Sequence, residues 1–294
     1  MSSETKLYSP RYPHFKEDEF KRPGWDSLSS FRYTKTLNPE WQYGDGGNGS
    51  DSGSASTKHE CIDPFEEGRS SFLNYKLLTT AIVPRPIAFL STRNKDGKLN
   101  IAPFSYFNYF NHDPPIFVVG FGTNTTKPNG YLQDTVRNIR ETGECVLNII
   151  SESFIEAANT TGAAAPAEVS EWEISGLTPV FDCKTVSAPR VKEAIFSMEA
   201  KVDTMKEIMS RAVEGKISGT LGIFDGTRFW VREDAIDDAK STVDPAILRP
   251  VGRYASIGYT RTIENFELPT PDFEIDIGGF KGINKIRMKK EANV

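Results

Sequence analysis

Short apolar runs separated by turn residues make up most of the chain, and long stretches with helical periodicity are rare. The clearest example is a pair of predicted strands, residues 84–92 and 100–108, on either side of Asp96-Gly97. Asp-Gly between two apolar runs is a strong hairpin signal, because both central residues of such a turn take a positive φ. The pattern therefore predicts a β-hairpin, and residues 112–115 (His-Asp-Pro-Pro) are expected to form the turn that closes it.

Other segments have the same character. Strands are predicted at residues 116–121, 145–150 and 191–202. The first of these lacks polar alternation, which indicates a strand buried on both faces. Within the strand-like stretch 217–231, Asp225-Gly226 predicts a second tight hairpin.

Residues 134–143 instead predict a short helix, in which Asp134 suits the N-cap and Gly143 suits the residue after the C-terminus. A parallel α/β sheet would show strands alternating with helices of about 10 to 15 residues, and most of this chain does not. The whole pattern predicts a mainly β fold, a β-barrel with helical insertions.

The two ends of the chain differ from its centre. Residues 1–57 are poor in aliphatic side chains, and the Gly- and Ser-rich stretch 44–54 is typical of a flexible linker. Aromatic residues in the preceding segment suit an extended arm that docks on a surface. We therefore predict a flexible N-terminal arm and linker at 1–57, a folded domain at 58–275 and a C-terminal tail at 276–294.

Charge and hydropathy narrow the classes of partner. The chain carries 35 Lys and Arg against 40 Asp and Glu, a net charge of −5, which argues against nucleic acid. No apolar run approaches the length of about 18 residues that a membrane span needs. The first six residues lack the apolar core of a signal peptide. These features predict neither a nucleic-acid partner nor a membrane partner.

The cysteines and histidines are few and scattered. The three cysteines lack any metal-ligand spacing, and their odd number without an export signal predicts a reducing, cytoplasmic location. His14, His59 and His112 are far apart, so a metal site or a histidine-dependent triad is not expected. We name no catalytic residue and no metal ligand.

Small and hydroxylated residues occupy the second strand of the predicted hairpin. Ala102 and Pro103 remove bulk and Ser105 offers a hydroxyl, which would fit a flat ligand with hydrogen-bonding edges. An edge strand with a bulge at Pro103 would explain the same residues. Both interpretations remain open.

The predicted helix start offers a second candidate. A helix N-terminus exposes unpaired N–H groups and a partial positive charge, which suits a phosphate, and Thr135 adds a hydroxyl. Lys127 and Arg85 would add charge if the fold brings them near. An ordinary capped helix is the alternative.

Four blocks in this order, residues 84–92, 100–108, 113–115 and 134–143, resemble the flavin reductase-like family, which has an FMN-binding split β-barrel and includes flavoredoxin. Residues 249–253 resemble a late strand of the family, so the resemblance covers about residues 60–270. The N-terminal arm resembles that of fungal members.

The resemblance implies a homodimer with FMN near the subunit interface. It places Arg85, Pro86, Ala88 and Phe89 along the isoalloxazine, Asn100, Ala102, Pro103 and Ser105 along its other edge and the ribityl chain, and Asp134 and Thr135 at the phosphate end. Many members have Lys directly before the Asp-Thr pair, whereas this chain has Gln133. Lys127 is a candidate substitute for that phosphate contact.

The resemblance also implies an NAD(P)H-dependent flavin reductase, in which a hydride passes from nicotinamide to flavin N5 and reduced FMN can reach a partner monooxygenase. No GxGxxG motif follows a strand, so a separate Rossmann site is not expected. The alternatives are a flavin-binding electron carrier that does not oxidise NAD(P)H, and a flavin-free interaction module. The sequence leaves open the electron acceptor, the choice of NADH or NADPH, and whether FMN is prosthetic or diffuses.

Overall fold

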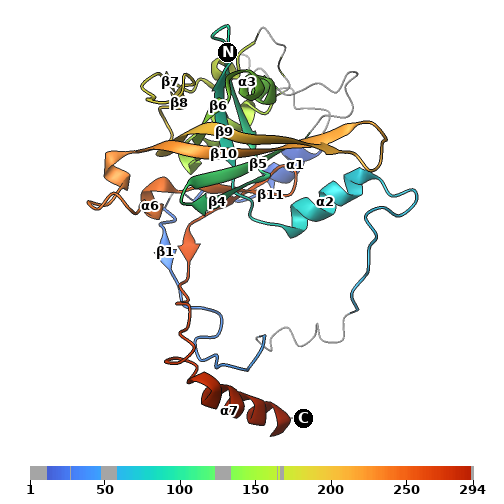
Figure 1. Ribbon diagram of the computed structural model, residues 1–294, viewed down its shortest axis with the longest axis vertical. Helices are drawn as coiled ribbons and strands as arrows, with labels where there is room; N and C mark the ends of the chain where they lie inside the picture. Colours follow the sequence, from blue (N-terminus) through green and yellow to red (C-terminus); the bar gives the residue numbers. More distant parts are fainter. Residues whose placement is uncertain are drawn as a thin grey trace. The chain divides into compact units, whose positions relative to one another are not determined.

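The computed structural model describes residues 12–26, 28–47, 58–122, 134–163, 165 and 169–292. The chain divides into two units, residues 1–30 and 31–294. The first contains α1 (Phe15–Phe20), and the second contains all the other elements of Figure 1. The boundaries proposed for the arm, the domain and the tail stay a prediction.

A seven-stranded antiparallel sheet forms the centre of the second unit, with strand order β3-β2-β6-β9-β10-β5-β4. Its strands are β2 (Ala88–Arg93), β3 (Leu99–Phe104), β4 (Phe107–His112), β5 (Pro115–Gly122), β6 (Glu144–Asn148), β9 (Phe196–Met209) and β10 (Ile217–Val231). Figure 1 shows the long strands β9 and β10 running side by side across the sheet. The sheet bends so that β3 and β5 approach each other. The prediction of a mainly β fold with helical insertions is confirmed.

The described residues also contain helices and three small strand pairs. The helices are α2 (Ser71–Ala81), α3 (Asp134–Thr142), η3 (Glu152–Phe154), α4 (Ile155–Thr160), α5 (Glu171–Ser175), η4 (Glu233–Ala235), α6 (Pro245–Leu248) and α7 (Gly279–Ala292). The pairs are β1 (Arg32–Tyr33) with β13 (Glu264–Asn265), β7 (Pro179–Val180) with β8 (Arg190–Val191), and β11 (Val251–Tyr254) with β12 (Gly258–Arg261).

The sheet carries a hydrophobic core on each face. Successive strand residues point to opposite faces, so Leu90 belongs to one core and Phe89 to the other. The first core is inside the barrel, where Phe117 stacks on Phe224 with ring centroids 4.9 Å apart. It also includes α3, whereas the second core includes α4 and α5. Strand β2 is therefore buried on both sides.

The first predicted hairpin is confirmed, because β2 pairs with β3 across the turn at residues 94–98. Its turn differs from the expected one, since only Gly97 of the Asp-Gly pair has a positive φ, +87°. The Asn94 side chain accepts a hydrogen bond from the Lys98 N–H at 2.7 Å. A longer loop ending in a left-handed glycine needs one positive φ rather than two.

The second predicted hairpin is wrong. Residues 217–231 form one continuous strand, β10, that passes through Asp225 and Gly226. A Cβ on Gly226 would lie 2.5 Å from Met198 Sδ and 3.1 Å from the Pro115 carbonyl oxygen. The glycine therefore permits close approach of neighbouring strands and does not make a turn.

Four other predicted segments are corrected in detail. The strand expected at residues 100–108 is interrupted at Ser105 and Tyr106, after which β4 begins. The turn at residues 112–115 is confirmed as a turn, but it joins β4 to β5. The strand at 116–121 alternates, with Phe117, Val119 and Phe121 buried and the residues between them half-buried, so it is not buried on both faces. The stretch 191–202 is divided between β8 and β9.

The predicted helix at 134–143 is confirmed as α3. Gly143 follows it with a φ of +71°, and its N–H donates to the Ile139 carbonyl at 2.8 Å, as expected for a left-handed C-terminal glycine. Asp134 is the first helical residue, and the residues directly before it lie outside the described part.

Candidate functional site

The strand β3 and the corner after it present the half-exposed small residues that the sequence singled out. Ala102, Pro103 and Ser105 are each half-buried, and Tyr106 is 48% exposed. Tyr106 is held at the corner because its carbonyl accepts a hydrogen bond from the Gly120 N–H at 2.6 Å. This strip can offer a hydroxyl and an aromatic ring to a ligand.

The residues that the sequence placed along the flavin on the first strand differ in their exposure to solvent. Ala88 and Phe89 are fully buried and point into the two opposite cores. Pro86 is exposed. Only Pro86 of these three presents a side chain at the surface, and the other two pack into the cores on either face of β2.

Arg85 is buried and connects two backbone segments. Its Nη1 donates to the carbonyl oxygens of Thr79 at 2.6 Å and Ile82 at 3.0 Å, and its Nη2 donates to that of Ala255 at 2.9 Å. Its Nε is one of three buried side-chain atoms in the described chain without a hydrogen-bond partner, with Ser151 Oγ and Trp172 Nε1. The guanidinium thus connects the end of α2 to the β11–β12 turn and retains one unused donor.

Tyr106 lies in the electrostatic field of Arg85 and Tyr75. Its phenol pKa is raised, first by burial and then by Tyr75, while Arg85 acts in the opposite direction. Tyr75 belongs to α2. The phenol of Tyr106 stays protonated near neutral pH and can donate a hydrogen bond.

The most direct contact within the predicted site joins the strand to the helix. The Asn100 side chain donates from Nδ2 to Thr135 Oγ1 at 2.7 Å, and both side chains are buried. Thr92 accepts a hydrogen bond from Asn138 Nδ2 at 3.0 Å in the same cluster. The structure therefore brings together two of the predicted site residues, separated by 35 positions, at the start of α3.

Charges of both signs surround the start of α3. Asp134 pairs with Arg137 one turn further along the helix. The pKa of Glu171 is raised, first by burial and then by the nearby Asp134 carboxylate, while Lys98 lowers it. A phosphate here would use the helix N-terminus and Lys98 against two carboxylates. Lys127 and Gln133 lie outside the described residues.

Sequence reasoning missed two members of this region: Thr92 and Asn138. Thr92 and Asn138 are buried polar residues on elements that otherwise supply the core. A polar residue at a core position of a strand or helix was the signal that could have identified them.

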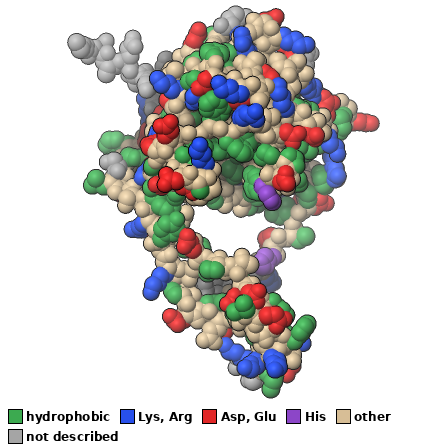
Figure 2. Space-filling model, turned by 60° about the vertical axis from the view of Figure 1, so that its left-hand side comes forward, with side chains coloured by type: hydrophobic (Ala, Val, Ile, Leu, Met, Phe, Trp, Pro, Cys, Tyr) green, Lys and Arg blue, Asp and Glu red, His purple; other side chains and the backbone are tan. Residues whose placement is uncertain are grey.

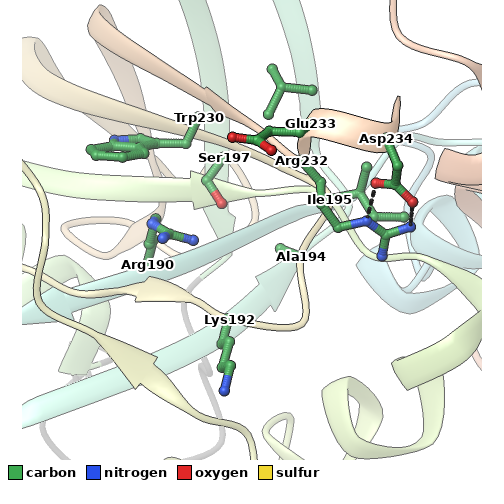
Figure 3. A pocket seen from close by; sticks show the side chains of 10 residues that line it. Arg190, Lys192, Ala194, Ile195, Ser197, Trp230, Arg232, Glu233 and Asp234 are labelled. Atoms are coloured by element: carbon green, nitrogen blue, oxygen red, sulfur yellow. Dashed lines mark hydrogen bonds and ion pairs between the residues drawn. The ribbon is translucent and has the colours of Figure 1, made fainter. Parts of the chain in front are cut away.

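A cavity of about 500 Å³ lies elsewhere, where residues 190–197 meet residues 230–234 (Figure 3). Arg190 stacks on the Trp230 ring at 4.9 Å and forms a two-pronged ion pair with Asp182. Arg232 and Asp234 pair with each other, as the dashed lines show. The arginines are thus already neutralised, and none of the predicted flavin residues lines this cavity, so we do not place the site there.

The described residues were also searched for cysteine nucleophiles and for metal ligands. Burial raises the pKa of the Cys145 thiol, and it raises that of Cys183 to about 12, so both remain thiols. Among the described residues, no group of three His, Cys, Asp or Glu side chains could hold a metal ion. The helices within the described ranges are all too short or too polar to cross a membrane.

Comparison with known proteins identifies the fold and the family. The family described as "Flavin reductase like domain" matches residues 80–247. This chain belongs to the flavin reductase-like family. Nitrilotriacetate monooxygenase component B from Bacillus cereus is 36% identical, with a TM-score of 0.66, covering 72% of this chain and 100% of that chain.

Two further structures are similar to this flavin reductase-like chain. A 2-nitrobenzoate 2-nitroreductase from Pseudomonas fluorescens is 28% identical, with a TM-score of 0.60, over 74% of this chain and 98% of that chain. A split-barrel protein from Shewanella frigidimarina shares the fold at 19% identity and a TM-score of 0.60, over 73% of this chain and 100% of that chain. The split-barrel fold expected from the sequence is therefore shown, whereas the likeness of the arm to fungal members finds no support in these comparisons.

Proposed function

We propose that this chain is an NAD(P)H-dependent flavin reductase that binds FMN on the strip formed by β3, the Ser105–Tyr106 corner and the start of α3. The family match and the contact of Asn100 with Thr135 support this proposal. The contact of Asn100 with Thr135 is the main support for the proposal, because it connects the half-exposed strand β3 to a helix N-terminus suited to an anion.

The residues present fit a flavin in chemical terms. Pro86, Ala102 and Pro103 leave room for a planar ring, and Ser105 and the protonated Tyr106 offer hydrogen bonds to its polar edge. Arg85 Nε is a buried donor still without a partner among the described residues. The proposal changes the expected contacts in one respect, since Ala88 and Phe89 support the strand and do not touch the ring.

When bound, FMN would supply hydride acceptance from a nicotinamide and electron transfer onward. The chain's own residues have the task of binding and orienting. The rigid two-sided core around β2 fixes the position of β3, and the apolar side chains Ala102 and Pro103 exclude water from one face of the ligand. No acid or base among the described residues is required for this role.

Two similar proteins suggest two different acceptors for the electrons of the reduced flavin. The name of the Bacillus cereus protein favours transfer of reduced flavin to a monooxygenase. The name of the Pseudomonas fluorescens protein favours direct reduction of a nitro group. A flavin-binding electron carrier that ignores NAD(P)H is the alternative from another class, and a flavin-free interaction module is a further one.

We also propose a homodimer, because one chain leaves many large apolar side chains in water. On α2, directly after it and on β4, the exposed ones include Phe72, Leu78, Ile82, Tyr109 and Phe110. Large exposed apolar patches on a protein often mark a surface that another chain covers. A cytoplasmic location remains a prediction from the cysteine content.

An anaerobic titration tests the proposed function. Purified protein loaded with FMN should lose its flavin absorbance when NADH or NADPH is added. Protein that fails to bind added FMN would contradict the proposal, and bound FMN that neither nucleotide bleaches would favour the electron carrier.

A substitution tests the site itself. Ser105→Trp should fill the strip and raise the FMN dissociation constant by about 100-fold or more, because the ring can no longer reach the strand. Ser241→Trp, in an exposed loop outside the site, is the matched control. Equal FMN affinity in the two variants, with circular dichroism spectra like that of the parent, would show that β3 is not the flavin wall.

A further inference from the structure

The chain after β12 separates its charges into two blocks, outside the residues that the family match covers. We call residues 264–276 the acidic segment, because it holds five Asp and Glu residues and no Lys or Arg. Residues 281–290, within α7, hold five Lys and Arg residues and no Asp or Glu. The formal charges of the two blocks, −5 and +5, are therefore equal and opposite, and neither block contains a compensating charge.

One charge of each block is used by the arm at residues 31–47. Arg32 Nε donates to Glu264 Oε2 at 2.7 Å, where β1 pairs in parallel with β13. Lys289 pairs with Asp45 at 3.0 Å. The arm therefore holds both blocks, and it neutralises only one charge in each.

Most of the other charges in the two blocks have no partner of opposite sign. The Glu274 carboxylate lies against Gly279 at the start of α7, where a negative charge stabilises a helix. Six exposed side chains form no ion pair among the described residues: Glu267, Asp272, Asp276, Lys281, Lys285 and Arg287. The two blocks are close in sequence, yet these charges do not neutralise each other within one chain.

The stretch that carries both blocks has no hydrophobic core of its own. Among residues 263–289 the structure buries only Gly279. Ile286 is half-buried, on the side of α7 that approaches Gly44 of the arm. A helix of 14 residues is marginally stable alone and gains most of its stability from packing. We therefore expect a further surface to cover the rest of α7.

Large apolar side chains are exposed in both blocks. On α7, Phe280 is 79% exposed and Met288 is 68% exposed. On the acidic segment, Leu268 is 72% exposed and Ile275 is 84% exposed. Figure 2 shows the Lys and Arg side chains gathered at the end of the molecule that carries α7. Each block thus combines exposed apolar side chains with charges of one sign, and the two blocks are complementary surfaces.

We propose that the acidic segment and α7 of one chain bind α7 and the acidic segment of a second copy across a two-fold axis. One sequence carries both surfaces, so an antiparallel contact of this kind pairs them twice. The unpaired carboxylates of each acidic segment would then face the unpaired Lys and Arg side chains of the other copy's helix. This inference goes beyond the flavin site and rests on the homodimer of the proposed function.

Charge changes in the intact chain test the contact. Lys281→Glu/Lys285→Glu/Arg287→Glu should raise the dimer dissociation constant by about tenfold or more, because carboxylates then face carboxylates. Sedimentation equilibrium measures this constant. The control is Lys95→Glu/Lys206→Glu/Lys216→Glu, which reverses three exposed lysines elsewhere and changes the net charge equally.

The acidic segment is tested by Glu267→Lys/Asp272→Asn/Asp276→Asn. The two asparagines keep a side-chain oxygen for the backbone N–H groups that Asp272 and Asp276 bind. This variant should also raise the dissociation constant, by less than the α7 variant does, because it removes attraction without adding repulsion between the two surfaces.

A mixture of the two variants distinguishes a contact between chains from one within a chain. In the mixed dimer, the unchanged helix of one variant meets the unchanged acidic segment of the other. The mixed dimer should therefore be tighter than the dimer that either variant forms alone, as measured by sedimentation with a fluorescent label on one variant. Equal dissociation constants for the three dimers would overturn the contact.

Single cysteines test the geometry independently of charge. In a Cys61→Ser/Cys183→Ser background, with the buried Cys145 left in place, one variant carries Leu268→Cys and another carries Met288→Cys. An antiparallel contact places the far end of the acidic segment beside the far end of α7. The mixture should therefore oxidise to a covalent dimer on a non-reducing gel. Equal cross-linking of either variant alone would overturn this arrangement.

Failure of this contact and failure of the homodimer give different results. A wild-type dimer whose dissociation constant neither set of charge changes alters would overturn the contact and leave the homodimer intact. A wild-type protein that is monomeric at all concentrations would overturn both. FMN titration of the same sample would still report on the flavin site.

Discussion

Two buried polar regions on the same sheet differ in how fully their groups are paired. Glu199 of β9 is completely buried and accepts four hydrogen bonds: at Oε1 from the Lys184 N–H and Trp230 Nε1, and at Oε2 from the N–H and hydroxyl of Thr185. At the start of α3, Asn100 and Thr135 pair with each other beside half-exposed residues of β3.

The difference teaches how to distinguish a structural polar group from a binding one. A buried carboxylate with four donors has little capacity left for a ligand, and it fixes the loop that carries Lys184 and Thr185. The Asn100–Thr135 pair lies beside the half-exposed strand residues Ala102 and Pro103. A ligand can bind beside the second region, whereas it could only disrupt the first.

The largest expected effect comes from breaking the Glu199 network. Glu199→Leu should lower the free energy of unfolding by about 3 kcal/mol or more, because it leaves the half-buried Trp230 Nε1 and Thr185 N–H donors without their acceptor. Urea unfolding measures this loss. The FMN dissociation constant of the folded fraction should not change.

Glu207→Leu is the matched control, because Glu207 lies on the same strand and makes an exposed ion pair with Arg140. Its cost should stay below about 1 kcal/mol. If both variants lost the same stability, the hydrogen bonds of Glu199 would contribute no more than a surface ion pair does, and the comparison would fail.

Local signals explain which parts of the fold were predictable. The β2–β3 hairpin and the end of α3 at Gly143 are each set by residues within one turn of each other. Gly226 looked the same as a turn glycine in the sequence, yet its role is to let β10 pass close to Met198. That role depends on a neighbouring strand and cannot be read from the adjacent residues.

The candidate site also contains residues that local sequence identified and contacts that only long-range packing created. Ala102, Pro103 and Ser105 were found because small residues in a strand are locally unusual. The sequence did not show that Asn100 contacts Thr135, or that Ala88 and Phe89 point into separate cores, since both follow from long-range packing. Arg85 was identified as a ligand contact, and its bonds to three carbonyl oxygens could be seen only after α2 and the β11–β12 turn were placed.

A smaller effect sharpens the comparison at the start of α3. Thr135→Val keeps the shape of the side chain but removes the acceptor of Asn100, so the FMN dissociation constant should rise about tenfold. Isothermal titration with FMN measures it. Stability should fall by about 1 kcal/mol.

Thr142→Val controls for the loss of a hydroxyl in the same helix, because Thr142 Oγ1 donates only to the Asn138 carbonyl at 2.9 Å. It should have a similar cost in stability with unchanged FMN affinity. A Thr142→Val variant that bound FMN as weakly as Thr135→Val would remove the start of α3 from the site.

The smallest effect uses two glutamates whose pKa values move in opposite directions from the usual value of 4.5. Burial acts to raise the pKa of Glu199, but hydrogen bonds from Thr185, Lys184 and Trp230 outweigh it and the pKa is lowered. Ionised Glu199 therefore stabilises the fold at pH values above 4.5, the usual glutamate pKa. This contribution is lost as the pH falls through the lowered pKa of Glu199. The cost of Glu199→Gln should shrink over the same fall in pH.

Glu171 has the opposite sign, because burial and then Asp134 raise its pKa. As the pH rises past 4.5 the unfolded state ionises first, so ionisable Glu171 destabilises the fold at neutral pH. Glu171→Gln should therefore raise the unfolding free energy there by less than about 1 kcal/mol, and the gain should vanish in acid. Urea unfolding across pH measures both variants. Parallel pH profiles of the two variants would mean that the Glu171 carboxylate is stabilised as well as the Glu199 carboxylate. A phosphate at the start of α3 would then meet less repulsion from Asp134 than we infer.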